Sequence, residues 1–302
     1  MLTAVTMILA AAVLAILAIA VAYVLGWANR AFHVEVDPQV EAILESLPGA
    51  NCGGCGFVGC AEYAEAVARA GADVALCAPG GAGCARRLAE IMGVSVSRTF
   101  PYRAVVHCAA HEDHKLDRTP YDGEPTCAAA NLVAGVQGCT FGCLGLGDCT
   151  RACGYDAIHV IDGLATVDYE KCIGCKACAR ACPRNIITMV PFKSDRMLVI
   201  ACSNQDAGPD VKAVCQVGCI GCSACSRNAE LMEMKGKLPM IDYDRYDEWA
   251  DFTVAREKCP RESMLYVGKP SAEDLAAVAG EEMPSRIEAD FKTTVDETQW
   301  RG

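Results

Sequence analysis

The sequence of 302 residues predicts an α+β protein with an N-terminal transmembrane helix, a small helical domain and two related α+β modules. Three observations lead to this fold class. An uncharged apolar stretch opens the chain, the 21 cysteines fall in tight groups, and one set of cysteine spacings occurs twice. We expect the following parts: a transmembrane anchor at 1–30, a helical domain at 31–95, an α+β module at 96–197, a degenerate copy of it at 198–267, and a polar tail at 268–302.

Residues 2–28 form the first predicted element, a membrane-spanning helix. About 26 residues at ~1.5 Å each exceed the ~30 Å thickness of the hydrocarbon core. A cleaved signal peptide is the alternative, but it needs a basic start and a shorter apolar stretch. Tyr23 and Trp27 suit the membrane interface, and Arg30 follows directly, which favours a cytoplasmic C-terminal side. We therefore expect a retained, single-pass anchor.

The segment 31–95 has start and stop signals for three short helices. Asp37 followed by Pro38 is typical of a helix start. Glycine, which adopts the left-handed conformation readily, is typical just after a helix end. We expect one helix from Pro38 to before Pro48, one from about Ala61 to Ala70 ended by Gly71, and one ended by Gly93.

The same segment contains the first group of candidate ligands, Cys52, Cys55, Cys60 and Cys77, with gaps of two, four and sixteen residues. The glycine-rich turn NCGGCGFVGC lets the backbone approach a bound group closely. We predict that these four cysteines hold a [4Fe-4S] cluster. A zinc knuckle or free thiols are the alternatives.

Residues 172–183 read CIGCKACARACP, with three cysteines at every third position, a fourth cysteine four residues later and a proline directly after it. This is the run that binds [4Fe-4S] clusters in bacterial ferredoxins. Tetrahedral zinc usually takes two cysteine pairs, so the spacing favours a cluster. The apolar segments 102–107, 158–162 and 186–190 are expected to be strands of a ferredoxin-like α+β module.

An internal repeat covers this region. Three cysteines recur 76 residues later, and the pair Cys182-Pro183 recurs 77 residues later as Cys259-Pro260. The segment DYEK at 168–171 likewise matches DYDR at 242–245. The three recurring cysteines are Cys139, Cys143 and Cys149, which correspond to Cys215, Cys219 and Cys225.

In two-cluster ferredoxins, the distant fourth cysteine of each half ligates the cluster of the other half. Applied to 96–197, this rule predicts two [4Fe-4S] clusters. The first would take Cys139, Cys143, Cys149 and Cys182. The second would take Cys153, Cys172, Cys175 and Cys178.

The second copy has lost one complete ligand set. Ala229 stands where Cys153 stood, and DEWADFTVA replaces the CIGCKAC run. The copy keeps Cys219, Cys222, Cys225 and Cys259, which we predict hold another [4Fe-4S] cluster. Cys215 remains an alternative to Cys222, because the repeat aligns Cys215 with Cys139. The expected total is four clusters and sixteen ligands.

Cys84, Cys108, Cys127 and Cys202 show no ligand spacing and are expected to be small buried residues, with a fifth cluster as the alternative. An odd number of closely grouped cysteines argues against a secreted disulfide framework. The formal net charge of −11 argues against nucleic acid as a partner. We find no dinucleotide fingerprint or acid–base group, so we expect no bond chemistry from this chain alone.

The anchor, the motif at 52–77 and the segments TCAAANLVAG, GCLGLGDC and VDYEKCIGC together resemble the B subunits of Rnf ion-translocating electron-transport complexes, over about residues 1–265. The resemblance implies a component of a membrane-bound ferredoxin:NAD⁺ oxidoreductase that accepts electrons from reduced ferredoxin while the complex moves Na⁺ or H⁺. It also implies other membrane and peripheral subunits as partners and a location in the cell (inner) membrane. A membrane-anchored polyferredoxin serving a hydrogenase or another oxidoreductase is the alternative, and a non-redox zinc module is a third class.

Overall fold

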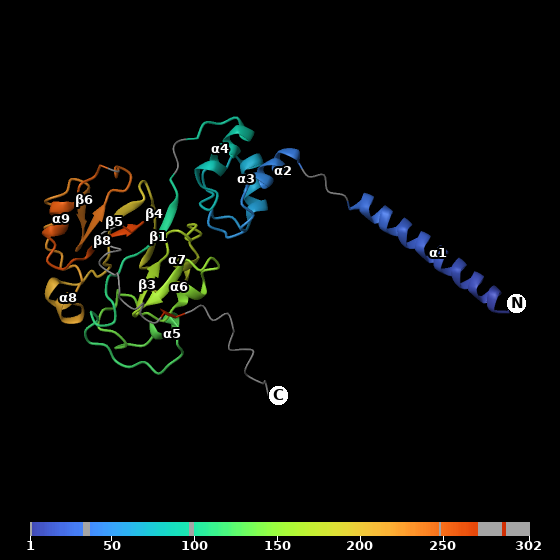
Figure 1. The fold of residues 1–302 in the computed structure, drawn as a ribbon. Helices are drawn as coiled ribbons and strands as arrows, with labels where there is room; N and C mark the ends of the chain where they lie inside the picture. The colour runs from blue at the N-terminus through green and yellow to red at the C-terminus, as the bar shows by residue number, and fades with distance from the viewer. Residues whose placement is uncertain (1, 33–36, 97–99, 248, 271–285, 288–302) are drawn as a thin grey trace.

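The computed structural model describes residues 2–32, 37–96, 100–247, 249–270 and 286–287. It has the expected α+β composition, arranged in three parts along the chain. A long N-terminal helix leads to a small helical domain, and a larger part that contains the strands follows (Figure 1). Most of the tail expected at 268–302 lies outside the described residues.

The N-terminal helix α1 spans Leu2–Ala31, as predicted. It stands apart from the other elements (Figure 1), and none of its most apolar stretch, Ala11–Ala31, is buried against the rest of the chain. By length and composition α1 can cross a membrane, because 21 residues at ~1.5 Å per residue match the hydrocarbon core.

The helical domain consists of α2 (Pro38–Ser46), α3 (Cys60–Ala70) and α4 (Gly81–Met92). The three predicted helices are confirmed, together with their end signals. The Asp37 carboxylate accepts a hydrogen bond from the Gln39 N–H at 2.9 Å, which caps α2. Gly71 and Gly93 end α3 and α4 in the left-handed conformation, with φ of 66° and 64°.

The first α+β unit contains four strands, and the three expected strand segments are confirmed. β1 pairs with β4 and β2 pairs with β3, both antiparallel. The tight turn between β2 and β3 is formed by Asp162 and Gly163, both with positive φ, which is typical of a two-residue hairpin. The elements are β1 (Tyr102–Val106), α5 (Cys127–Ala130), α6 (Asp148–Arg151), β2 (Ile158–Ile161), β3 (Leu164–Val167), α7 (Ala177–Ala181) and β4 (Ile187–Pro191).

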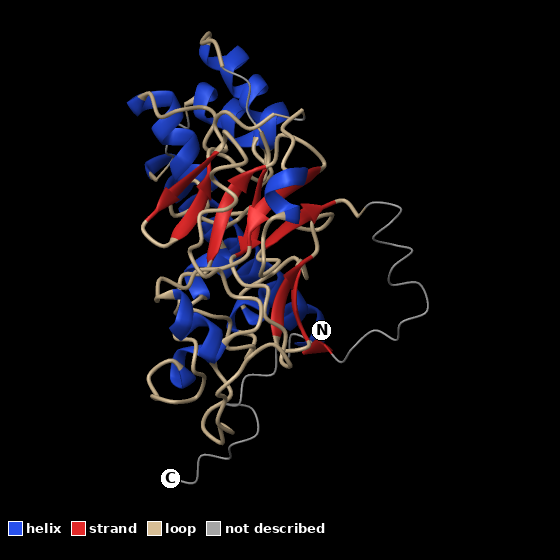
Figure 2. Ribbon diagram, turned by 90° about the vertical axis from the view of Figure 1, so that its left-hand side faces the viewer, coloured by secondary structure: helices blue, strands red, loops and turns tan. Residues whose placement is uncertain are grey.

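The second unit repeats this connectivity. β5 pairs with β8 and β6 pairs with β7, again antiparallel, and most strands of the two units lie in one band across the molecule (Figure 2). β5 begins at Arg196, so this strand starts two residues before the boundary expected at 198. The elements are β5 (Arg196–Ile200), α8 (Gly208–Val214), β6 (Met232–Lys235), β7 (Leu238–Ile241), α9 (Thr253–Glu257) and β8 (Met264–Gly268). From the tail, β9 (Arg286–Ile287) pairs with β2.

The repeated tetrapeptides DYEK and DYDR form the same turn in both units. Asp168 Oδ1 accepts hydrogen bonds from the N–H groups of Glu170 at 3.0 Å and Lys171 at 3.3 Å. Asp242 Oδ1 accepts hydrogen bonds from the two corresponding N–H groups at 3.0 and 3.2 Å. The sequence repeat is therefore also a structural repeat, because an aspartate side chain closes the same turn after the hairpin in each copy.

Candidate metal centres

Four cavities in the two α+β units are each lined by four cysteines. One of them is surrounded by a predicted set, Cys153, Cys172, Cys175 and Cys178. Cys153 follows α6, Cys178 lies on α7, and the other two lie in the loop before α7. That loop turns at Gly174, where φ is 76° and a Cβ would collide with the carbonyl oxygen of Tyr102.

A second predicted set surrounds a cavity in the second unit, lined by Cys219, Cys222, Cys225 and Cys259. The cavity lies between the loop that follows α8 and the segment that follows α9. Cys215, the alternative to Cys222, does not line this cavity but another one. The arrangement therefore favours Cys222 in this set.

The third cavity differs from the sequence-based assignment. The structure brings Cys143, Cys149 and Cys182 together, but the fourth cysteine is Cys127 instead of Cys139. The reason is a helix cap. The carboxylate of Asp148 accepts hydrogen bonds from the N–H groups of Cys127 at 3.0 Å and Ala128 at 2.9 Å. This contact joins the start of α5 to the start of α6, next to Cys149.

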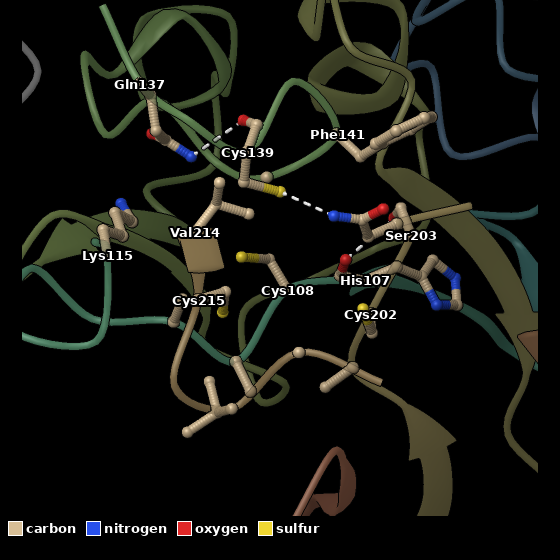
Figure 3. A pocket seen from close by; sticks show the side chains of 17 residues that line it. His107, Cys108, Lys115, Gln137, Cys139, Phe141, Cys202, Ser203, Val214 and Cys215 are labelled. Carbon is tan, nitrogen blue, oxygen red and sulfur yellow. Dashed lines mark hydrogen bonds between the residues drawn. The ribbon is translucent and has the colours of Figure 1, made fainter. Parts of the chain in front are cut away.

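The fourth cavity is lined by Cys108, Cys139, Cys202 and Cys215 (Figure 3). No sequence spacing marks these residues as a set. Three of them were expected to be spare cysteines or an alternative ligand, and Cys139 was assigned to another group. A signal was available in the repeat, which aligns Cys139 with Cys215.

The remaining predicted set, Cys52, Cys55, Cys60 and Cys77, lies in the helical domain. Gly53 and Gly56 turn the loop with φ of 64° and 98°, and the Asn51 side chain accepts a hydrogen bond from the Cys60 N–H at 2.8 Å. These contacts bring the first three cysteines around one short turn. Cys84, expected to be buried, is fully buried on α4, and its sulfur approaches Cys77.

The helical domain contacts the first α+β unit at the cavity of Cys175. The Arg180 guanidinium donates a hydrogen bond to the carbonyl oxygen of Cys52 at 3.2 Å. Gly54 lies so close to the backbone of Cys175 that a Cβ on Gly54 would be 3.3 Å from the Cys175 carbonyl oxygen. The loop that contains Cys52 and Cys55 is therefore adjacent to the cavity lined by Cys175.

Two equivalent arginines hold the cysteine loops of the α+β units. Arg184 Nη1 donates hydrogen bonds to the carbonyl oxygens of Cys139 at 2.9 Å and Gly142 at 2.7 Å. Arg261 donates to the carbonyl oxygen of Gly218 at 3.3 Å and to that of Cys215. Each arginine follows a Cys-Pro pair, and each binds the loop that starts at the recurring cysteine of its own copy. Burial lowers the pKa of Arg184, yet an arginine side chain stays charged.

Each of the four cavities presents four cysteine thiols to one space. Among the described residues, no group of three or more His, Cys, Asp or Glu side chains is placed to hold one metal ion. Burial raises the pKa of Cys178 and Cys108 to about 12 and that of Cys202 to about 11, so these sites favour thiolates only when a cation binds them. Soft thiolate ligands of this kind select iron–sulfur clusters or zinc.

The comparisons with known proteins agree with iron–sulfur chemistry. Residues 47–79 match the family model FeS, for an Fe-S cluster, and residues 165–188 match Fer4, the 4Fe-4S binding domain. These matches cover the groups of the helical domain and of the CIGCKACARACP run.

Three curated relatives, all B subunits of membrane oxidoreductases, match over most of the chain. The one from the Na(+)-translocating ferredoxin:NAD(+) oxidoreductase complex of Acetobacterium woodii is 37% identical over 240 residues, which is 78% of this chain and 71% of that protein. The one from the ion-translocating oxidoreductase complex of Methanosarcina acetivorans is 38% identical over 212 residues (69% and 79%). The one from the proton-translocating ferredoxin:NAD(+) oxidoreductase complex of Clostridium ljungdahlii is 34% identical over 217 residues (71% and 76%).

Proposed function

Because the chain belongs to the family of B subunits of ion-translocating oxidoreductase complexes, we propose that it is the iron–sulfur electron-transfer subunit of such a complex. In this function, the complex couples electron transfer from reduced ferredoxin to NAD⁺ with translocation of Na⁺ or H⁺ across a membrane. The family membership agrees with the resemblance deduced from the sequence. The observation that carries the proposal is the contiguous series of cysteine-lined cavities in a chain that begins with an apolar helix.

The order of the cysteine groups along α6 and α7 supports an electron-transfer role. Cys149 on α6 and Cys153 just after it line two different cavities. Cys178 on α7 and Cys182 at its end line the same two cavities in the opposite order. This crosswise sharing is the arrangement of two-cluster ferredoxins, and it keeps neighbouring clusters close. We propose [4Fe-4S] clusters at both cavities, at the second-copy cavity and in the helical domain.

Clusters of this type supply one-electron transfer when they are bound. This chain would bind the clusters through cysteine thiolates and surround them with small residues. Arg184 and Arg261 would hold the cysteine loops in place. We expect NAD⁺, and any flavin, to bind partner subunits, and reduced ferredoxin to dock on this one.

Helix α1 supports a membrane-anchored protein. We propose that it crosses the membrane once and places the cysteine-rich part in the cytoplasm, because Arg30 lies at its C-terminal end and the clusters require a reducing compartment. The other membrane and peripheral subunits of the complex would then bind around α1 and the helical domain.

Anaerobic purification of the tagged full chain from its own membranes tests this function. We expect ion-translocating membrane subunits to co-purify, and reduced ferredoxin to generate EPR signals of reduced [4Fe-4S] clusters. Deletion of residues 2–31 is the matched control, which should abolish membrane association and keep the EPR signals. Co-purification with hydrogenase subunits would instead favour an anchored polyferredoxin, and zinc in place of iron would exclude both functions.

A further inference from the structure

We propose that Cys108, Cys139, Cys202 and Cys215 hold an additional [4Fe-4S] cluster at the junction of the two α+β units, and that Cys127 replaces Cys139 in the neighbouring set. The inference rests on the proposed iron–sulfur role and extends it to a site that no sequence motif marks. The chain would then hold five clusters, with Cys84 as the single remaining cysteine.

Like each of the three other cavities, the site is lined by four cysteines. Its cysteines are more uniformly buried than those of the second-copy cavity, where Cys222 is exposed. All four of its cysteines are less than a tenth exposed. Figure 3 shows them around one cavity, two from the first unit and two from the second. Four buried thiols that share one cavity provide the complete ligand set of a cubane.

The two units contribute to this site in equivalent ways. Cys139 and Cys215 are partners in the repeat, and each begins the loop that an arginine clamps. Cys108 and Cys202 are equivalent in the fold, because each lies two residues after a strand: β1 ends at Val106 and β5 ends at Ile200. Each unit therefore supplies one cysteine from a strand end and one from a loop. Both units therefore contribute equally to the lining of the cavity.

The hydrogen bonds to the sulfurs follow the same relation. The Cys143 N–H donates to Cys108 Sγ at 3.5 Å, and the Cys219 N–H, its repeat partner, donates to Cys202 Sγ at 3.3 Å. In addition, the buried amide of Asn204 donates to Cys139 Sγ at 3.5 Å. Donors directed at sulfur are the means by which a protein supports thiolate ligands and adjusts the potential of a cluster.

A buried cation also lines the cavity. Lys115 is 7% exposed, and its ammonium donates to the carbonyl oxygen of Gly163 at 2.6 Å. Within the part of the chain that the structure describes, no carboxylate lies within ion-pair distance of this ammonium. A buried charge without an opposite charge is costly, and a cubane with four thiolates, which carries roughly two negative charges, would supply one.

The site lies between the cavities of the two units, where a cluster could pass electrons from one unit to the other. Cys143 and Cys219, whose N–H groups bind its sulfurs, themselves line the cavities on either side. A cluster here would connect the two clusters of the first unit with the single cluster of the second. The degenerate second unit would then be the end of the series and not an isolated site.

Iron and sulfide quantification on the full chain, purified anaerobically in detergent, tests the proposal. We expect about twenty irons per chain, from five cubanes of four irons each, where the sequence-based assignment gives about sixteen. The double variant Cys108→Ala/Cys202→Ala should lose about four irons and one reducible EPR component. Ser203→Ala is the matched control, because Ser203 lines the same cavity without a thiol, and it should keep the wild-type iron.

Single variants test the exchange of Cys127 and Cys139. Cys139→Ala should remove the same EPR component as the double variant, whereas Cys127→Ala should remove a different one. About sixteen irons in the wild type would overturn the additional cluster, and no loss of iron in Cys127→Ala would overturn the exchange of Cys127 and Cys139. The wild-type count decides the matter even if a variant fails to fold. An iron content near zero would instead contradict the proposed function as a whole.

Discussion

The two α+β units share their construction but fill their interiors differently. Both have the same strand pairing, the same aspartate-closed turn and the same arginine clamp. In the first unit, Cys153 and the cysteines of the CIGCKAC run line a cavity. In the second unit, Ala229 replaces Cys153, and a stack of Tyr243, Tyr246 and Phe252 lies in the core, with ring centroids 5.9 and 5.4 Å apart.

If the cavity of the first unit holds the proposed cluster, a metal cluster and an aromatic core are alternative ways to stabilise one fold. One buried cluster of the first unit consists of cysteines, alanines and a few aliphatic residues, whereas Val105, Val190 and Phe192 of this unit pack into the core of the second. The second core contains buried tyrosine, phenylalanine and methionine. Aromatic side chains bury large apolar areas, whereas small residues leave that contribution to the metal–thiolate bonds. The larger side chains of the second unit would then take the place of the missing ligand set.

Removal of iron should produce the largest difference in stability between the two units. After oxidation and chelation, we expect the β2–β3 hairpin to lose more than about 4 kcal/mol of protection, because its core depends on ligation. The β6–β7 hairpin should keep a larger share of its protection. Hydrogen exchange with mass spectrometry measures both hairpins in one sample, and equal losses would contradict the comparison.

Truncation of the aromatic stack should destabilise the second unit more than the first. Phe252 is 1% exposed, and Phe252→Ala should destabilise the second unit by about 3–5 kcal/mol while the EPR signal of the Cys153 set remains. Native-state hydrogen exchange of β6 and β7 reports the change. Trp249→Ala is the control, since Trp249 is 84% exposed, and its effect should stay within about 0.5 kcal/mol. A loss confined to the first unit would argue against the aromatic stack as the substitute for a cluster.

Loss of the two loop-binding arginines should show the smallest difference between the units, because each arginine donates two hydrogen bonds to carbonyl oxygens of its own cysteine loop. Arg184→Met and Arg261→Met each remove two hydrogen bonds from a charged donor to loop carbonyl oxygens. We expect each variant to cost about 1.5–3 kcal/mol and to accelerate iron release to a chelator to a similar extent. Arg→Lys should restore only part of the effect, because lysine lacks the planar fork. Unchanged release rates in both variants would show that the clamps do not hold the loops.

Much of the fold follows from local signals. The capping by Asp37, the left-handed glycines after α3 and α4, and the apolar segments of β1, β2 and β4 act within a few residues, so sequence patterns predict them. The same holds for cysteines spaced two residues apart, which a short loop necessarily brings together. The module boundary expected at 198 falls inside β5, whose extent depends on its pairing with β8.

The exchange of Cys127 and Cys139 did not follow from spacing. Both cysteines lie in irregular segments before Cys143, and either could reach its cavity by chain length. The choice depends on two tertiary contacts, the cap of α5 by Asp148 and the clamp of the Cys139 carbonyl by Arg184. Cys108 and Cys202 likewise gave no spacing signal, because their partners lie on other segments.

Sequence patterns predict the apolar N-terminal helix, the short capped helices, the repeated α+β module and the grouped cysteines. Which distant cysteines share a cavity follows only from the packing of the folded chain. Spacing limits only residues joined by a short loop, whereas a four-ligand site is closed by strands and loops that pack from far apart in the chain. The junction of Cys108, Cys139, Cys202 and Cys215 exists because two copies of one module pack against each other.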